Sequence, residues 1–134
     1  MPQVFDTSSL MALVLERGGE GVEHLFDEHV LDLTVYEAGN VLWKAHTRQN
    51  RIDGETLERL VSFLDELQSE VEVRPVSTLD LDRTMTIAVK DGLTFYDAAY
   101  VACAEAVEGR LTTEDRELRE AARGYVDVAS VDDL

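Results

Sequence analysis

The segment LTFYDAAYVACAEAVEGRLTTED, residues 93–115, decides the fold class of this chain. Thr94 is a helix-capping residue, and the small and apolar residues after it predict a helix through about Val107. Leu111–Thr113 predicts a short β-strand, and the charged sequence that follows predicts a helix over Glu114–Arg123. A helix that leads into a strand and then into another helix is typical of a parallel α/β sheet.

The rest of the chain shows the same alternation of short β-rich segments and longer helical ones. A proline closes the third expected strand, which favours a position near an edge of the sheet. The other expected strands end at Phe5 and cover Leu31–Val35, Val71–Val76 (the third) and Tyr125–Ala129. The other expected helices cover Thr7–Glu16, a segment through Glu28 after a break at Gly18-Gly19, Tyr36–Gln49, Glu55–Ser69 and Ser77–Val89. Right-handed crossovers would then place helices on both faces of a central parallel sheet of four to five strands, a three-layer α/β fold.

Length and composition fit one compact domain over residues 1–134. Apolar residues make up 45% of the chain, and no apolar run approaches the ~18 residues of a membrane-spanning helix. The first six residues lack the basic and apolar regions of a secretory signal peptide. We therefore expect a cytoplasmic protein without a membrane segment. Cys103, the only cysteine, lies in an apolar helical pattern and is expected to be a buried small hydrophobe.

The charge is strongly negative, because 28 acidic residues stand against 12 basic ones and give a net charge of -16. Such a surface repels nucleic acid at low salt. Bound divalent cations would cancel part of this charge, and a salt-rich cytoplasm would limit its range to roughly 3 Å at 1 M. Because Lys44 and Lys90 are the only lysines, we hypothesise that the protein comes from a halophilic organism.

Four acidic residues stand at junctions between the expected elements. Asp6 follows the first strand, Glu37 the second and Asp115 the fourth. Asp97 begins the helix that precedes the fourth strand. In parallel α/β sheets, ligands bind beyond the carboxyl ends of the strands. The positions therefore predict that these four carboxylates gather at one edge of the sheet.

Each of these acids also has an explanation that needs no function. Asp6, Asp97 and Asp115 stand where carboxylates cap helices or interact with the helix dipole, and Glu37 could be an ordinary surface charge. Taken together, four carboxylates at one edge would repel one another unless a cation lay among them. Oxygen ligands suit Mg²⁺ or Mn²⁺, and such an ion assists hydrolysis of a phosphodiester by offsetting charge on the phosphate.

Four motifs, in order along the chain, resemble those of the PIN-domain family, and above all of its VapC-type toxins. They are Val-Phe-Asp6-Thr-Ser8, the helix start Glu37-x-x-Asn40, Tyr-Asp97-Ala and Leu-Thr-Thr113-x-Asp115. The resemblance covers essentially the whole chain and implies a PIN-like α/β/α fold. It also implies a Mg²⁺- or Mn²⁺-dependent endoribonuclease, the toxin of a type II toxin–antitoxin module with a small antitoxin as its partner. In this resemblance the catalytic and metal-binding residues are Asp6, Glu37, Asp97 and Asp115, and the polar residues beside them are Thr7, Ser8, Asn40 and Thr113.

The expected helix that contains Glu37 also carries three cations on one stripe. Lys44, Arg48 and Arg51 follow Glu37 at helical spacing, and Arg116 comes directly after Asp115. We interpret these four cations as candidate RNA contacts. A solvated helix face is the alternative, because mixed charges along a helix are common.

Another face of the same helix combines Tyr36, Gly39 and Trp43. Aromatic residues beside a small one favour a protein contact, such as a homodimer. Packing against a neighbouring helix of the same chain would use these residues equally well.

Two other small α/β classes fit the sequence less well. A receiver domain would need paired acids at the first strand and a lysine after a late strand, but Asp6 stands alone and no lysine follows Lys90. A phosphatase that begins with Asp-x-Asp would need a second carboxylate, where this chain has Asp6-Thr-Ser8. The main alternative to an enzyme is a PIN-like scaffold that has lost catalysis and binds protein or RNA.

Overall fold

The computed structural model describes the backbone of residues 1–134 and the surroundings of every residue except Gly18. Over these residues, five short strands form one parallel sheet in the order β3-β2-β1-β4-β5. The strands are β1 (Gln3–Phe5), β2 (His29–Leu31), β3 (Glu72–Arg74), β4 (Arg110–Thr112) and β5 (Asp127–Ala129). The expected parallel α/β fold is confirmed, and the third strand lies at an edge.

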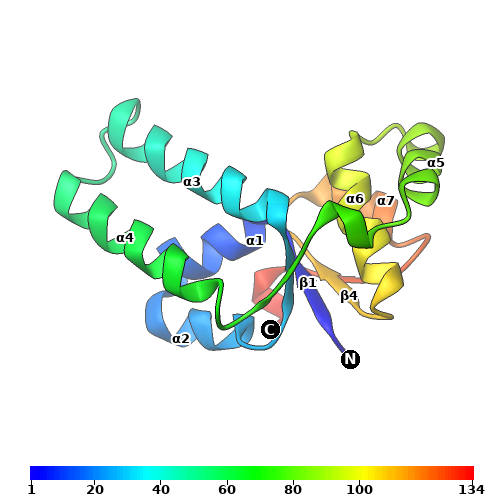
Figure 1. Cartoon of the computed structure of the whole chain (residues 1–134), viewed down its shortest axis with the longest axis horizontal. Helices are drawn as coiled ribbons and strands as arrows, with labels where there is room; N and C mark the ends of the chain where they lie inside the picture. Colours follow the sequence, from blue (N-terminus) through cyan, green and yellow to red (C-terminus); the bar gives the residue numbers. More distant parts are fainter.

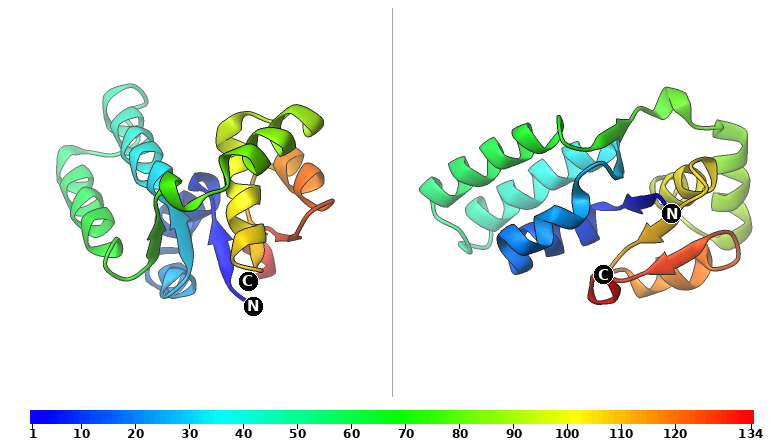
Figure 2. Two further views of the ribbon diagram at one scale, coloured as in Figure 1. Left: turned by 45° about the vertical axis from the view of Figure 1, so that its right-hand side comes forward. Right: turned by 90° about the horizontal axis from the view of Figure 1, so that it is seen from below.

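Helices cover both faces of the sheet, as Figures 1 and 2 show. One side consists of α1 (Thr7–Ala12), α2 (Gly18–Val22), α3 (Asp32–Thr47) and α4 (Gly54–Leu67). The other side consists of α5 (Leu81–Asp91), α6 (Phe95–Ala106) and α7 (Arg116–Ala122). Short 3-10 turns are η2 (Glu23–Leu25), η3 (Val76–Thr78) and η4 (Val131–Asp133), and η1 (Leu13–Arg17) is a π-helical turn. None of the helices over the described residues combines the length and the hydrophobicity that crossing a bilayer requires.

The strands divide the apolar residues between two cores. Successive residues of a strand point to opposite faces of a sheet. Val4 and Leu31 accordingly belong to the core beneath α5, α6 and α7, while Phe5 and Val30 belong to the core beneath α1, α3 and α4. Cys103 lies fully buried in the first core, as expected, and burial raises the pKa of its thiol to about 11.

The start of α3 differs from the expectation, because residues 32–35 are helical and not part of the second strand. The β-branched pair at Thr34 and Val35 favoured a strand. In the fold, side chains satisfy the first turn of a helix instead. Thr34 Oγ1 accepts the Leu31 N–H at 3.2 Å, and the Asp32 carboxylate accepts the Leu33 N–H at 2.9 Å. These local hydrogen bonds outweigh the strand propensity.

Two further boundaries were wrong. The chain does not break at residues 18–19, because the π-helical turn η1 continues directly into α2. Gly21 permits this close packing, since an added Cβ would lie 2.4 Å from Arg17 Cβ. The helix expected from Ser77 begins only at Leu81, where the Asp80 carboxylate accepts the Arg83 N–H at 3.0 Å and caps α5.

The strand order places a switch point at the centre of the sheet. The chain moves outward from β1 through β2 to β3, and then returns to the other side of β1 with β4 and β5. Phe5 pairs in register with Thr112, so Asp6 and Thr113 leave β1 and β4 side by side. Crevices at such switch points are where parallel α/β sheets bind their ligands.

Candidate functional site

The four acids predicted from the sequence lie at the carboxyl edge of the sheet, around this switch point. Asp6 follows β1, and Asp115 is the N-cap residue of α7 after β4. Glu37 lies near the start of α3, and Asp97 lies in the first turn of α6. Burial raises the pKa of Asp97, and the negative charges of Asp115, Asp6 and Glu37 raise it further. The fold therefore brings the other three carboxylates within electrostatic range of Asp97.

Asp6 is the most enclosed of the four, with 6% of its surface exposed. Its Oδ1 accepts the Ser8 hydroxyl at 2.7 Å and both the N–H and the hydroxyl of Ser9 at 3.0 Å. Its Oδ2 accepts the Thr113 hydroxyl. Burial raises the pKa of the Asp6 carboxyl, while these four hydrogen bonds oppose that rise. The Ser9 N–H bond also caps α1, so Asp6 has a structural role as well.

Thr113 connects Asp6 to the start of α7. It is fully buried, and its hydroxyl accepts the Asp115 N–H at 3.1 Å. Ser8 lies 3.2 Å from the same hydroxyl and accepts the Glu114 N–H at 3.0 Å. Asp115 in turn caps α7 through the Leu118 N–H at 3.2 Å. The capping role considered for Asp115 is therefore present, and it fixes the residue at the edge of the site.

Glu37 is held by hydroxyl groups from two other helices. The Thr7 hydroxyl donates to Glu37 Oε1 at 2.8 Å, and the Tyr100 hydroxyl donates to the same oxygen at 3.1 Å. Asn40, which the family resemblance placed in this role, is exposed and makes no hydrogen bond to Glu37 among the described contacts. Sequence reasoning missed Tyr100 because it lies in an apolar helical pattern. Tyr100 lies three residues after Asp97, and residues at this spacing share a helix face, so the spacing was the feature of the sequence that indicated a position near the site.

The cations expected to lie along α3 are only partly on that helix. Lys44 is exposed in the last turn. Arg48 is the C-cap residue, and its guanidinium lies 5.3 Å from the centre of the Trp43 ring, within the range of a cation–π contact. Because α3 ends at Thr47, the expectation that Arg51 continues the helical stripe was wrong. Arg116 is exposed at the start of α7, next to Asp115.

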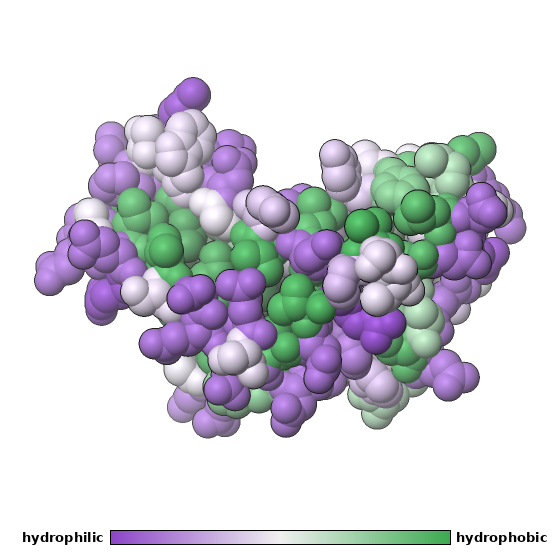
Figure 3. Space-filling view, in the orientation of Figure 1, coloured by the Kyte–Doolittle hydropathy of each residue, from purple (hydrophilic) through white to green (hydrophobic). Residues whose placement is uncertain are grey.

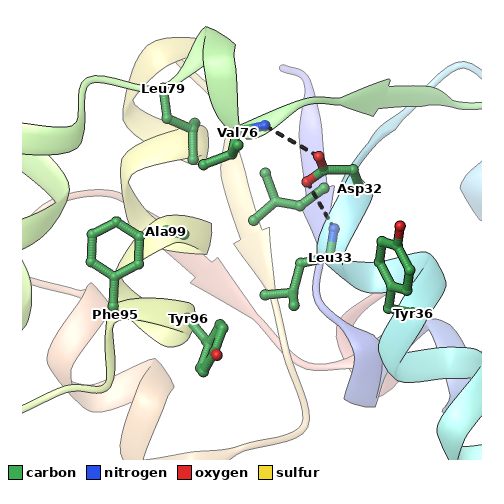
Figure 4. A pocket seen from close by; sticks show the side chains of 9 residues that line it. Asp32, Leu33, Tyr36, Val76, Leu79, Phe95, Tyr96 and Ala99 are labelled. Carbon is green, nitrogen blue, oxygen red and sulfur yellow. Dashed lines mark hydrogen bonds between the residues drawn. The ribbon is translucent and has the colours of Figure 1, made fainter.

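An apolar pocket of about 240 Å³ lies between the starts of α3 and α6 (Figure 4). Tyr36 and Tyr96 line it with 81% and 61% of their surfaces exposed, and each immediately precedes a site acid. The Asp32 carboxylate, also in its lining, already accepts the N–H groups of Leu33 and Val76. Figure 3 shows apolar side chains exposed in the hollow between the two helical sides. The surface beside the acids is thus apolar and aromatic.

The donor chemistry of the site fits a hydrated divalent cation. All four candidate ligands are carboxylates, the donors that Mg²⁺ and Mn²⁺ prefer. In the part of the chain that the structure describes, no group of three or more His, Cys, Asp or Glu side chains is arranged to hold a metal ion directly. Mg²⁺ usually keeps several waters and takes only one or two carboxylates directly. The donors are therefore chemically suited to such an ion, but over the described residues they do not form a closed cage of protein ligands.

The structure is that of a small parallel α/β protein with an acidic site around its central switch point, and comparison with known proteins identifies the family. The PIN domain family model matches residues 4–124, so the chain belongs to the PIN domain family. It is 37% identical over 126 residues to Exonuclease VapC9 of Pyrobaculum aerophilum, covering 94% of this chain and 90% of that protein. It is 35% identical over 125 residues to Ribonuclease VapC3 of the same organism, covering 90% and 94%.

Solved structures agree with this assignment. The crystal structure of PAE2754 from Pyrobaculum aerophilum superimposes with a TM-score of 0.79 at 34% identity, over 99% of this chain and 85% of that one. A toxin–antitoxin complex from Klebsiella pneumoniae superimposes with a TM-score of 0.64 at 18% identity, over 96% and 97%. The second likeness shows the shared fold alone. The PIN-like architecture expected from the sequence motifs is thus confirmed.

Proposed function

We propose that this chain is a metal-dependent ribonuclease of the VapC toxin type, with Asp6, Glu37, Asp97 and Asp115 as its catalytic and metal-binding residues. The observation that carries the proposal is the placement of four carboxylates from four elements around one switch point at the carboxyl edge of the sheet. The negative charges of three of them raise the pKa of the fourth, Asp97, in addition to burial. Mutual repulsion of this kind favours a bound cation. The names of the two relatives, an exonuclease and a ribonuclease, support a nuclease.

Mg²⁺ or Mn²⁺ is the proposed cofactor. Bound at the carboxylate cluster, such an ion supplies a Lewis acid beside the scissile phosphate. Asp97 and Glu37 are half-buried and Asp115 is exposed, so these three side chains are accessible to an ion or substrate from solvent. Thr113, Ser8 and Ser9 hold Asp6 by donating hydrogen bonds to it. Thr7 likewise holds Glu37.

The RNA backbone would run from this cluster past exposed cations. Lys44 and Arg48 lie on or at the end of α3, the helix that also carries Glu37, and Arg116 directly follows Asp115. Arg51 lies beyond α3 and would extend the same path. Lysine and arginine contacts to phosphate supply most of the sequence-independent affinity of nucleic-acid-binding proteins. These residues offset only locally a net charge of -16, so we expect affinity for RNA to be modest.

Two protein partners and a location belong to the same proposal. A small antitoxin is suggested by the VapC names of the relatives and by the fold-level likeness to a toxin–antitoxin complex.

A homodimer is supported by Tyr36 and Trp43, which expose 81% and 45% of their surfaces on one side of α3. Gly39 lies between them, and an added Cβ there would meet no atom within 4 Å. A toxin that cuts cellular RNA would act in the cytoplasm.

The decisive experiment incubates the protein with structured RNA and Mn²⁺, with and without a chelator. We expect cutting that the chelator abolishes and that Asp97→Asn reduces about 10³-fold, which corresponds to roughly 4 kcal/mol of transition-state stabilisation. Lys44→Glu should raise KM for RNA and spare Mn²⁺ binding. Lys90→Glu, which changes the other lysine of the chain, is the matched control. Full activity in the chelator, or in Asp97→Asn, would contradict the proposal.

A covalently closed circular RNA separates two modes of cutting. An endonuclease linearises the circle, whereas an exonuclease, the activity named for one relative, leaves it intact. We expect linear products. A protein that binds RNA but cuts no substrate under any of these conditions would instead be a PIN-like scaffold.

A further inference from the structure

The hydroxyl of Tyr100, a residue of α6, meets three polar side chains from α1 and α3. It lies 2.7 Å from Thr34 Oγ1, 3.1 Å from Glu37 Oε1 and 3.2 Å from Thr7 Oγ1. Only 2% of the Tyr100 surface is exposed, and its ring belongs to the core beneath α5, α6 and α7. The ring therefore packs as any apolar residue would, while the hydroxyl alone reaches the acidic edge of the sheet.

The hydrogen-bonding capacity of each group fixes the direction of these contacts. Thr34 Oγ1 already accepts the Leu31 N–H, so its own proton is free to be donated to Tyr100. Tyr100 has one proton, and the ionised Glu37 carboxylate can only accept. The hydrogen bonds therefore run in one direction, from the backbone of Leu31 through Thr34 and Tyr100 to Glu37.

Both hydroxyl donors to Glu37 reach the same carboxylate oxygen. Thr7 donates to Oε1 at 2.8 Å and Tyr100 at 3.1 Å, whereas Oε2 receives no hydrogen bond among the contacts described. Two donors on one oxygen fix the orientation of the carboxylate. The second oxygen then remains available to an external cation. Chains of hydrogen bonds also strengthen one another where water is excluded.

We propose that Tyr100 is the positioning residue of the site, because its hydroxyl holds Oε1 of Glu37 so that Oε2 is presented to the metal ion. This inference rests on the proposed metal-dependent function. Tyr100 acts through Glu37 and touches neither metal nor RNA.

Tyr100→Phe isolates the hydroxyl, because phenylalanine fills the same space in the core. The probe is Mn²⁺ alone, titrated by calorimetry in the absence of RNA. We expect Mn²⁺ affinity to fall by roughly 10- to 100-fold, the usual cost of removing a group that orients a metal ligand. In the cutting assay at fixed Mn²⁺, kcat should fall while KM for RNA stays unchanged. The matched control is Tyr125→Phe, because the Tyr125 hydroxyl donates to Asp91 and contacts no site acid.

A second background separates positioning from simple structural support. In Glu37→Gln the residue that Tyr100 orients is already impaired, so adding Tyr100→Phe should weaken Mn²⁺ binding no further. A structural role would instead lower the melting temperature in both backgrounds and leave Mn²⁺ affinity per folded molecule unchanged. That outcome, or wild-type Mn²⁺ affinity in Tyr100→Phe, would overturn the inference. A wild-type protein that neither binds Mn²⁺ nor cuts RNA would contradict the proposed function itself.

Discussion

Asp6 and Asp97 stand at the same edge of the sheet, but their surroundings are opposite in kind. Four hydrogen bonds from Ser8, Ser9 and Thr113 surround Asp6. Asp97 instead faces the carboxylates of Asp115, Asp6 and Glu37, and a hydrogen bond with Thr94 in its own turn opposes their effect on its pKa. One half of the site is thus organised by hydrogen bonds within the protein, whereas the other half brings together like charges that repel one another.

The causes of the two raised pKa values reflect the same difference. Burial is the largest cause for both carboxyls. At Asp6 every other contribution comes from a hydrogen bond and lowers the pKa. At Asp97 the next three contributions are like charges and raise it. Substitutions in the two halves should therefore change the free energy of unfolding in opposite directions.

The largest expected effect comes from removing a donor from the Asp6 half. Thr113→Val keeps the shape of a fully buried side chain but removes the hydroxyl that donates to Asp6 and accepts the Asp115 N–H. We expect the metal-free protein to lose about 2 kcal/mol of unfolding free energy, because a buried charged group loses a hydrogen bond. Asp97→Asn should have the opposite sign and stabilise the metal-free protein by about 0.5 kcal/mol, as other surface-charge changes do.

Urea unfolding in the presence of a chelator measures both changes. Thr86→Val is the control for the loss of a threonine hydroxyl, because Thr86 is exposed on α5 and bonds only the Asp82 carbonyl. If both substitutions destabilised the protein equally, the two halves of the site would not differ in the way described.

The sequence contained enough information to find the acids but not the groups that hold them. Asp6 and Asp115 follow directly after strands, so the alternation of strands and helices predicted their shared edge. Glu37 was also placed there, although the strand before it ends at Leu31 and not at Val35. An error of a few residues in a boundary does not move an acid to the other end of a parallel strand.

Tyr100 and Asn40 show where prediction from the sequence reached its limit. Which hydroxyl reaches Glu37 depends on how α6 packs beside α1 and α3, and no local pattern encodes that contact. A tyrosine among small apolar residues fits a core position equally well, and Tyr100 is indeed buried. Asn40 has helical spacing from Glu37 but remains exposed. Local spacing therefore identifies candidate ligands better than it identifies their hydrogen-bonding partners.

A smaller effect is expected from pH. A carboxyl whose pKa is higher in the folded state than in the unfolded state binds more protons when folded, so stability falls as the pH rises between the two values. For Asp6 and Asp97 that window lies above the ordinary aspartate pKa of about 3.9. The metal-free protein should therefore unfold at a higher temperature at pH 5 than at pH 7. Asp53 and Asp133, whose pKa values are lowered, oppose this trend only at more acidic pH.

Differential scanning calorimetry with a chelator present follows this pH dependence. Asp97→Asn should show a shallower rise between pH 7 and pH 5 than wild type, because one of the two titrating groups is gone. Saturating Mn²⁺ should flatten or reverse the rise, since ionised carboxylates bind the cation and protonated ones do not. A melting temperature that drops steadily from pH 7 to pH 5 without metal would contradict the raised pKa values.

The smallest expected effect is the response of the Asp97 half to salt. At 1 M KCl the screening length is about 3 Å, so repulsion between carboxylates in the partly exposed half should largely vanish. The hydrogen bonds to buried Asp6 are short-range and should be unaffected. The stabilising effect of Asp97→Asn should therefore disappear in KCl, while the loss of unfolding free energy in Thr113→Val should persist.

Wild type should itself become more stable in KCl, because its net charge of -16 is screened. This result would agree with the hypothesis of a salt-rich cytoplasm. Equal salt responses in the two variants would mean that repulsion at Asp97 is no stronger than elsewhere on this acidic surface.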